Sequence, residues 1–264
     1  MLALTVAVGA VAVTGIGVAF AGIQGSKHDL GTGGTSQFGS TGGGSGEVCV
    51  FCHTPHGSDT SASVPLWNRT LPTATYTRYS ALNTSTLDGT EAPVGSVSLA
   101  CLSCHDGTQA MDVMINAPGS GAGTPPAGTK MTGSGAFPML GTDLSNDHPI
   151  SIQYAGGGLT SADADGAYTN TKFKDKDFNA VYKSTINSVP VWWVDGNSDG
   201  IRQKTEMMLY TRTLSGTTQP FVECASCHDP HNASTASTTA GAQQVAFLRT
   251  SNTHSEVCLS CHNK

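Results

Sequence analysis

The chain has 264 residues, with 13 basic and 19 acidic side chains, so its formal net charge is −6 at pH 7. An acidic chain lacks the basic surface with which proteins bind nucleic acids, so we expect no nucleic-acid partner. Only 12% of the residues are charged and 32 are glycine, and long Ser/Thr/Gly tracts at 31–46, 116–136 and 232–242 favour loops over long helices.

Residues 1–21 are predicted to be a secretory signal peptide. Residues 2 to 23 carry no charge, and Ala19-Phe20-Ala21 has the small-x-small form that precedes a cleavage site. We therefore expect an exported protein whose mature part, 22–264, is a single domain. A membrane anchor is the alternative, because the apolar run is long enough to span a bilayer.

A C-x-x-C-H motif occurs four times and uses all eight cysteines. Its two thiols can add to the two vinyl groups of one haem, and the histidine then lies under the iron. Zinc sites and disulfides are the alternatives, but neither requires that histidine, and four such placements arise by chance about once in a million. We predict four covalent haem c groups. Their attachment cysteines and proximal histidines are Cys49, Cys52 and His53; Cys101, Cys104 and His105; Cys224, Cys227 and His228; and Cys258, Cys261 and His262.

The four motifs fall into two pairs along the chain. The first and third continue as C-x-x-C-H-x-P-H, and a plain C-x-x-C-H follows each of them. This order predicts haems 1 and 2 within 22–110, a central insertion at 111–215, and haems 3 and 4 within 216–264. Independent origin of the motifs is the alternative.

Strand-like runs cluster in the middle of the chain, at 149–154, 180–186, 189–194 and 207–214. Aromatic residues make up only 6% of the sequence, and no long amphipathic helix pattern occurs, so we expect the haems to form much of the core. The predicted fold class is a multihaem cytochrome c. It is mostly irregular coil, with short helical turns at the haem motifs, a few short antiparallel strands and a core stapled by haem.

Five further histidines are available as distal ligands of the haem irons. We predict bis-histidine ligation by His28, His56, His148 and His231, which implies low reduction potentials. His254 is the expected spare, because it lies just before its own motif at Cys258. His56 and His231 each follow a proximal histidine by three residues, so each should ligate a different haem.

A calcium-type loop is predicted between two strand-like runs. Residues 195–206 match the pattern D-x-N-x-D-G-x5-E of twelve-residue calcium loops. The expected ligands are the side chains of Asp195, Asn197, Asp199 and Glu206 and the carbonyl of Ile201. Calcium is thus a further expected cofactor. A solvated turn is the alternative, because the flanks do not look like EF-hand helices.

The order of short motifs resembles the secreted tetrahaem c-type cytochromes of metal-reducing bacteria, of the kind that polymerises into extracellular cytochrome filaments, or nanowires. The resemblance implies that haems stack in a continuous chain and that a histidine of one subunit completes a haem of its neighbour. His28, His56 and His231 match the candidate positions for that role. The motifs are SKHDL (26–30), CVFCHTPH (49–56), PLWNRT (65–70), CLSCH (101–105), NDHPIS (146–151), ECASCHDPH (223–231) and VCLSCHNK (257–264).

The predicted function is extracellular electron transfer through four closely spaced haems, without enzymatic catalysis. The expected location is extracellular or on the outer cell surface. The expected partners are copies of the chain joined head to tail, redox proteins of the periplasm or outer membrane, and extracellular electron acceptors. One alternative is a multihaem reductase of nitrite or hydroxylamine, which requires an iron with an open position. The other is a discrete periplasmic electron shuttle.

Overall fold

The computed structural model describes residues 22–31, 38, 46–126, 128–133, 139–231 and 247–263. The predicted signal peptide lies outside these residues. Among the residues inside them, no helix has the length and apolar character needed to cross a membrane.

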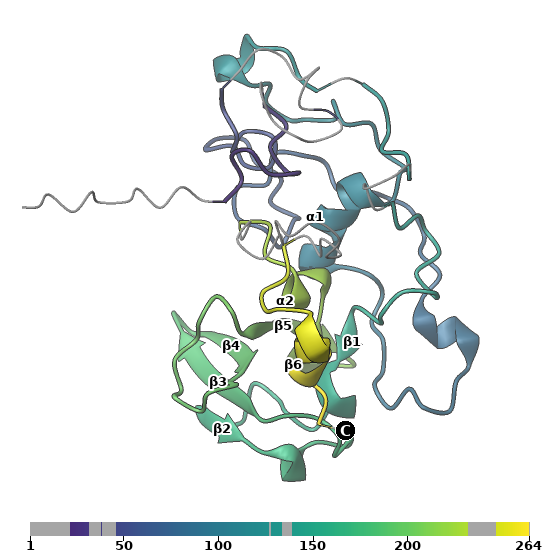
Figure 1. Ribbon diagram of the computed structural model, residues 1–264, viewed down its shortest axis with the longest axis vertical. Coiled ribbons are helices and arrows are strands. Elements are labelled where there is room, and N and C mark those ends of the chain that lie inside the picture. Colours follow the sequence, from purple (N-terminus) through teal and green to yellow (C-terminus); the bar gives the residue numbers. More distant parts are fainter. Residues whose placement is uncertain are drawn as a thin grey trace, which may run out of the picture.

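A six-stranded antiparallel sheet forms one half of the molecule (Figure 1). Its strand order is β1-β6-β5-β4-β3-β2. The long strand β5 joins two parts of the sheet, because residues 207–209 pair with β4 and residues 210–214 pair with β6. The strands are β1 (Ile152–Gln153), β2 (Gly166–Tyr168), β3 (Val181–Ile186), β4 (Val189–Val194), β5 (Met207–Leu214) and β6 (Thr217–Val222).

The main apolar core lies on this sheet. β-Branched and aromatic side chains suit a pleated, half-buried surface, and here Val181, Trp192 and Leu209 come together from three adjacent strands. Tyr154 and Phe173 close the cluster from the segments before β3. Two haem-motif cysteines, Cys227 and Cys261, pack against the same cluster, so the last two motifs are built onto the sheet.

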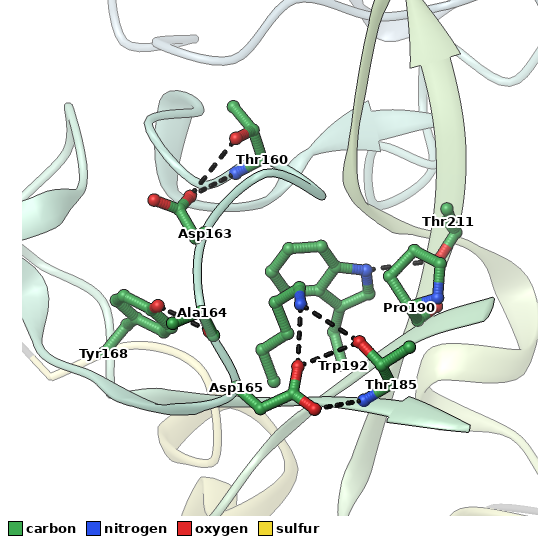
Figure 2. A network of polar contacts seen from close by, with 10 residues as sticks. Thr160, Asp163, Ala164, Asp165, Tyr168, Thr185, Pro190, Trp192 and Thr211 are labelled. Atoms are coloured by element: carbon green, nitrogen blue, oxygen red, sulfur yellow. Dashed lines mark hydrogen bonds and ion pairs between the residues drawn. The ribbon is translucent and has the colours of Figure 1, made fainter. Parts of the chain in front are cut away.

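A polar network secures the β2 edge of the sheet (Figure 2). Lys183 of β3 is only 2% exposed, and its Nζ lies 2.8 Å from Asp165 Oδ1. Asp165 also accepts hydrogen bonds from the backbone and hydroxyl of Thr185, while Trp192 Nε1 donates to Thr211 Oγ1. A buried charge is costly unless it is paired, so Lys183 fixes the loop before β2 onto β3.

The three α-helices all carry cysteines of the C-x-x-C-H motifs. They are α1 (Ser96–His105), α2 (Cys224–Cys227) and α3 (Glu256–Leu259). The 3-10 turns are η1 (Tyr79–Leu82), η2 (Gly119–Gly121), η3 (Tyr154–Gly156), η4 (Asn170–Lys172) and η6 (Thr253–Ser255). Helix α1 lies in the half of the molecule away from the sheet, and α2 lies where the two halves meet (Figure 1).

The second half of the molecule, which we call the loop half, contains residues 46–76, 96–126 and 128–133, Phe38 and the turn at 22–31. Residues 79–92 lie beside the sheet, because Glu91 bridges to Ile152 of β1 and Leu87 packs against the sheet core. The apolar cluster of the loop half has four buried members, Leu30, Phe38, Phe51 and Met111. Buried polar side chains add to it: Arg69 donates to the carbonyls of Met111 and Ala110. This half is held by a few apolar contacts and by side-chain hydrogen bonds to loop backbone.

The predicted fold class was wrong. A six-stranded sheet with its own apolar core organises the protein, rather than irregular coil around haem. The predicted strand positions coincide with β1, β3, β4 and β5, but β2 and β6 were missed and complete the sheet. Although aromatic residues are few, Tyr154, Phe173 and Trp192 are concentrated in one cluster, and that concentration makes an apolar core possible.

Candidate haem-binding sites

Each C-x-x-C-H motif lies on a tight turn or a helix end, which brings its two thiols and its histidine together. At the first motif, the amides of Cys52 and His53 both donate to the carbonyl of Cys49. The second motif forms the last turn of α1, the third forms α2 and the fourth extends from α3. Pro55 and Pro230 follow His53 and His228 by two residues and end the helical turns there. Helix α1 has no such proline and reaches ten residues.

The cysteines of successive motifs are neighbours in space. The thiol of Cys104 helps to raise the pKa of Cys52 to about 12, after the larger effect of burial. Cys101 and Cys224 hydrogen-bond to each other, which raises the pKa of Cys101 and lowers that of Cys224. The pKa of Cys261 is raised to about 12 by burial and then by Cys227 and Cys258. The four motifs therefore lie side by side in the order of the chain.

The first and third motifs share one local structure. After the first, Thr54 N donates to Leu66 O and Asn68 N donates to Cys52 O. After the third, Asp229 N donates to Phe247 O and Arg249 N donates to Cys227 O. Leu66 and Phe247 both have positive φ, 57° and 63°. The bridges His53–Trp67 and His228–Leu248 are thus equivalent.

An arginine completes each of these two equivalent units. Arg69 lies close enough to the Cys52 thiol to lower its pKa against the larger effect of burial, and Arg249 acts in the same direction on Cys227. The bridges align Asn68 with Arg249, so Arg69 lies one position further along its unit than Arg249 does. Sequence reasoning used the segment WNRT only for resemblance and missed the segment LRT.

The proximal histidine of the fourth motif is packed onto the sheet half. The ring centres of His262 and Phe178 are 4.4 Å apart, and the two residues form an antiparallel bridge. Asn179 N donates to Cys261 O at 2.8 Å, and Tyr154 Oη donates to the carbonyl of Asn179. The sheet core thereby fixes the direction of this motif.

His231 faces the proximal histidine of the first motif. The ring centres of His53 and His231 are 6.1 Å apart, and the ring planes differ by 16°. His53 Nδ1 hydrogen-bonds the carbonyl of Pro65 at 2.7 Å, while His231 Nδ1 lies 3.4 Å from Asp229 Oδ1. Such a partner on Nδ1 fixes the ring and leaves Nε2 for a metal ion.

His28 faces the proximal histidine of the second motif. The ring centres of His28 and His105 are 6.2 Å apart, with the planes at 75°. Burial, followed by the proximity of His105, lowers the pKa of His28 to about 4. The imidazole is therefore neutral at pH 7, the form in which histidine binds a metal ion. Its Nδ1 atom is buried without a hydrogen-bond partner, while the backbone of Pro230 acts on the ring and raises the pKa against the larger effect of burial.

These two histidine pairs fit a haem iron. A metal–imidazole bond is about 2 Å long and the ring centre lies about 1.1 Å behind its nitrogen, so two axial imidazoles have centres about 6.3 Å apart. Buried Trp67 Nε1 and Arg69 Nε also lack hydrogen-bond partners. Both lie beside the first motif and are donors that suit a carboxylate such as a haem propionate. The paired histidines, the distances between their ring centres and the two unpartnered N–H donors are all compatible with a bound haem.

Three other histidines are surface residues. His56, His148 and His254 are exposed and lie outside the two ring pairs, although exposure alone does not distinguish them, because the His231 side chain is 49% exposed. His148 Nδ1 hydrogen-bonds the carbonyl of Pro149 at 3.0 Å. His56 and His148, like the spare His254, stay unassigned as ligands within one chain.

The calcium-type loop connects β4 to β5. Asp195 accepts from the amides of Asp199 and Gly200, and Asp199 accepts from the amide of Ile201. Glu206 is 8% exposed and its Oε1 has no hydrogen-bond partner. Burial, and then the charges of Asp195 and Asp199, raise its pKa.

The acidic side chains of the loop are not gathered at one point in this structure. Among the described residues, no group of three or more His, Cys, Asp or Glu side chains is arranged to hold a metal ion. Asp195, Asn197 and Glu206 line one cavity together with Glu256 and Leu259 of α3. The loop therefore lies beside the fourth C-x-x-C-H motif, a proximity that the sequence did not reveal.

Comparison of the chain with models of known protein families gave no match, and comparison with curated proteins gave none either. The four motifs and the two histidine pairs are therefore the basis of the functional argument.

Proposed function

We propose that the protein is an electron-transfer protein that carries four covalent c-type haems and passes electrons between them. The observation that carries the proposal is that successive motifs are neighbours in space. Cys52 lies near Cys104, Cys101 hydrogen-bonds to Cys224, and Cys227 lies near Cys261. Haems attached at such neighbouring cysteines would lie close together. Close spacing is what rapid electron exchange between them requires.

Different residues of the chain would attach the haems, bind the irons and orient the ligands. The eight cysteines would hold the haems as thioethers, and the four motif histidines would bind the irons from one side. Bound haem supplies reversible one-electron chemistry. The carbonyl of Pro65 and the carboxylate of Asp229 orient His53 and His231. Two histidines on an iron leave no open position, which favours electron transfer over the reduction of nitrite or hydroxylamine.

We also propose that copies of the chain join head to tail outside the cell. His231 of the third motif faces His53 of the first motif. His56 occupies the place equivalent to His231 in the other unit, and its side chain is exposed. By this equivalence, His56 would reach the third motif of a neighbouring copy. Such a contact is heterologous and builds an open filament if the rotation does not close a ring.

The test uses the purified secreted protein. The ferrous form, prepared with dithionite, should be reoxidised completely by a soluble ferric chelate and should bind no carbon monoxide. Carbon monoxide binding together with turnover of nitrite or hydroxylamine would favour the reductase. Electron microscopy decides the assembly: filaments are expected, and particles that stay monomeric at high concentration with four six-coordinate irons would leave only the discrete shuttle.

A further inference from the structure

We infer that His231 is the distal ligand of the haem on Cys49 and Cys52, and that His28 is the distal ligand of the haem on Cys101 and Cys104. The inference rests on the proposed function and names the ligand pairs within it. It also makes the two irons spectroscopically different, because the two ring pairs have different angles.

The His53–His231 pair has the spacing of axial ligands. Its ring centres are 6.1 Å apart and its planes are nearly parallel, at 16°. Rings in direct stacking contact are closer, as His28 and Phe247 show with 4.2 Å and 12°. Bis-imidazole ligation requires about 6.3 Å between ring centres. The pair thus has the separation for a metal ion between the rings.

Three contacts hold His231 in this place. Its amide donates to Asp229 Oδ1 at 3.0 Å, and its Nδ1 lies 3.4 Å from the same oxygen. Arg249 NH1 lies 3.6 Å from Asp229 Oδ2 and so positions that carboxylate. Asp229 and Arg249 therefore act on the first haem site through His231, although both lie in the unit of the third motif.

The turn at 22–31 delivers His28 to the second motif. Gly22 N donates to the carbonyl of His231 at 3.0 Å. Asp29 is buried and accepts from the amides of Gly25 and Gly31. Phe247 stacks on the His28 ring and fixes its plane at 75° to that of His105. The turn that carries His28 is thus bonded to the backbone of His231, the distal ligand that we infer for the first haem.

Electron paramagnetic resonance of the ferric holoprotein tests the pairing. Nearly parallel imidazole planes give a rhombic low-spin spectrum, whereas nearly perpendicular planes give a signal with a large leading g value. His231→Ala should remove one of the four low-spin contributions, of the rhombic type. His28→Ala should remove one of the large-g type. Each variant should gain one high-spin haem, and added imidazole should restore the low-spin state.

The matched control is His254→Ala, which alters an exposed histidine outside both pairs and should leave the spectrum unchanged. His231→Met and His28→Met keep six-coordination and should each raise the potential of one haem, so they decide the question if an alanine variant does not fold. Variants that keep four haems and the full low-spin intensity would overturn the ligand pairing but not the proposed function. Loss of the same type of low-spin signal from the His231 and the His28 variants would also overturn the pairing. Fewer than four haems in the unaltered protein would overturn the proposed function instead.

Discussion

The sheet half and the loop half of the molecule are stabilised in different ways. The sheet half has a cluster of eleven buried residues from adjacent strands and segments, whereas the buried cluster of the loop half has four. Buried polar atoms without hydrogen-bond partners occur in both halves: on Trp67, Arg69 and Gln109 in the loop half, and on Trp193 and Glu206 in the sheet half. Because apolar burial dominates folding free energy, we expect the sheet half to depend less than the loop half on the haems that we propose.

The largest expected effect is loss of structure in the loop half when its first haem cannot attach. In Cys49→Ala/Cys52→Ala, backbone amides of the loop half should lose protection from hydrogen exchange, while β3 to β6 should keep theirs. Mass spectrometry of deuterated peptides measures this difference. The matched variant Cys258→Ala/Cys261→Ala should lose protection mainly around α3. Equal loss in both halves after the first change would contradict the contrast.

The second effect concerns the sheet core. Trp192 is 1% exposed and its Nε1 donates to Thr211. Trp192→Ala should lower the free energy of unfolding by about 3–5 kcal/mol, because it leaves a cavity. Denaturant unfolding followed by far-UV circular dichroism measures it. Ile186→Ala on β3, where the side chain is 46% exposed, should change stability by less than about 0.5 kcal/mol. Similar losses in the two variants would argue against a sheet-centred core.

Calcium should act on the sheet half alone. If the loop between β4 and β5 binds the ion, calcium at 100 times its dissociation constant adds about 2.7 kcal/mol to the free energy of unfolding. Glu206→Gln should abolish the gain. Glu256→Gln is the control, since Glu256 lines the same cavity outside the loop pattern. Titration calorimetry that detects no calcium binding to the unaltered protein would identify the loop as a solvated turn.

The smallest effect is a pH dependence where the two halves meet. Glu223 caps α2 and accepts from Ser98 of α1, and Arg212 NH1 lies 3.1 Å from its Oε1. Burial raises the pKa of Glu223 above its ordinary value. The folded state then holds the proton to higher pH than the unfolded state does, so stability is highest below the ordinary pKa and falls as pH rises through the raised value.

Glu223→Gln should flatten that fall. Denaturant midpoints measured between about pH 4 and 8 test it, with the exposed Glu256→Gln as control. If the unfolding midpoint of Glu223→Gln still changed fully with pH, another titratable group would be responsible for the dependence.

The sequence predicted local features better than it predicted the fold. Runs of β-branched and aromatic residues located β1, β3, β4 and β5, whereas β2 and β6 were missed. Strand β6 contains Pro220, a residue that is rare inside sheets, although it pairs with Thr211 here. Composition was a poor guide to the core, because Tyr154, Phe173 and Trp192 cluster in space despite their wide separation in sequence.

For the candidate sites too, the sequence predicted the local motifs but not the contacts between distant residues. Spacing identified every C-x-x-C-H motif, because its chemistry is local. The contact of Cys101 with Cys224 and the pairing of His53 with His231 join residues more than a hundred positions apart. The first contact depends on how α1 packs against α2, and the second on how the turn after the third motif packs against the first motif. No local pattern contains that information.

We propose that all eight cysteines bind haem, and the mass of the intact, denatured protein from a host that matures c-type cytochromes measures this. The expected mass is that of the chain plus four haems, with no free thiol and no disulfide. A haem-free or partly loaded chain, for instance one with a disulfide between the neighbouring Cys101 and Cys224, would contradict it.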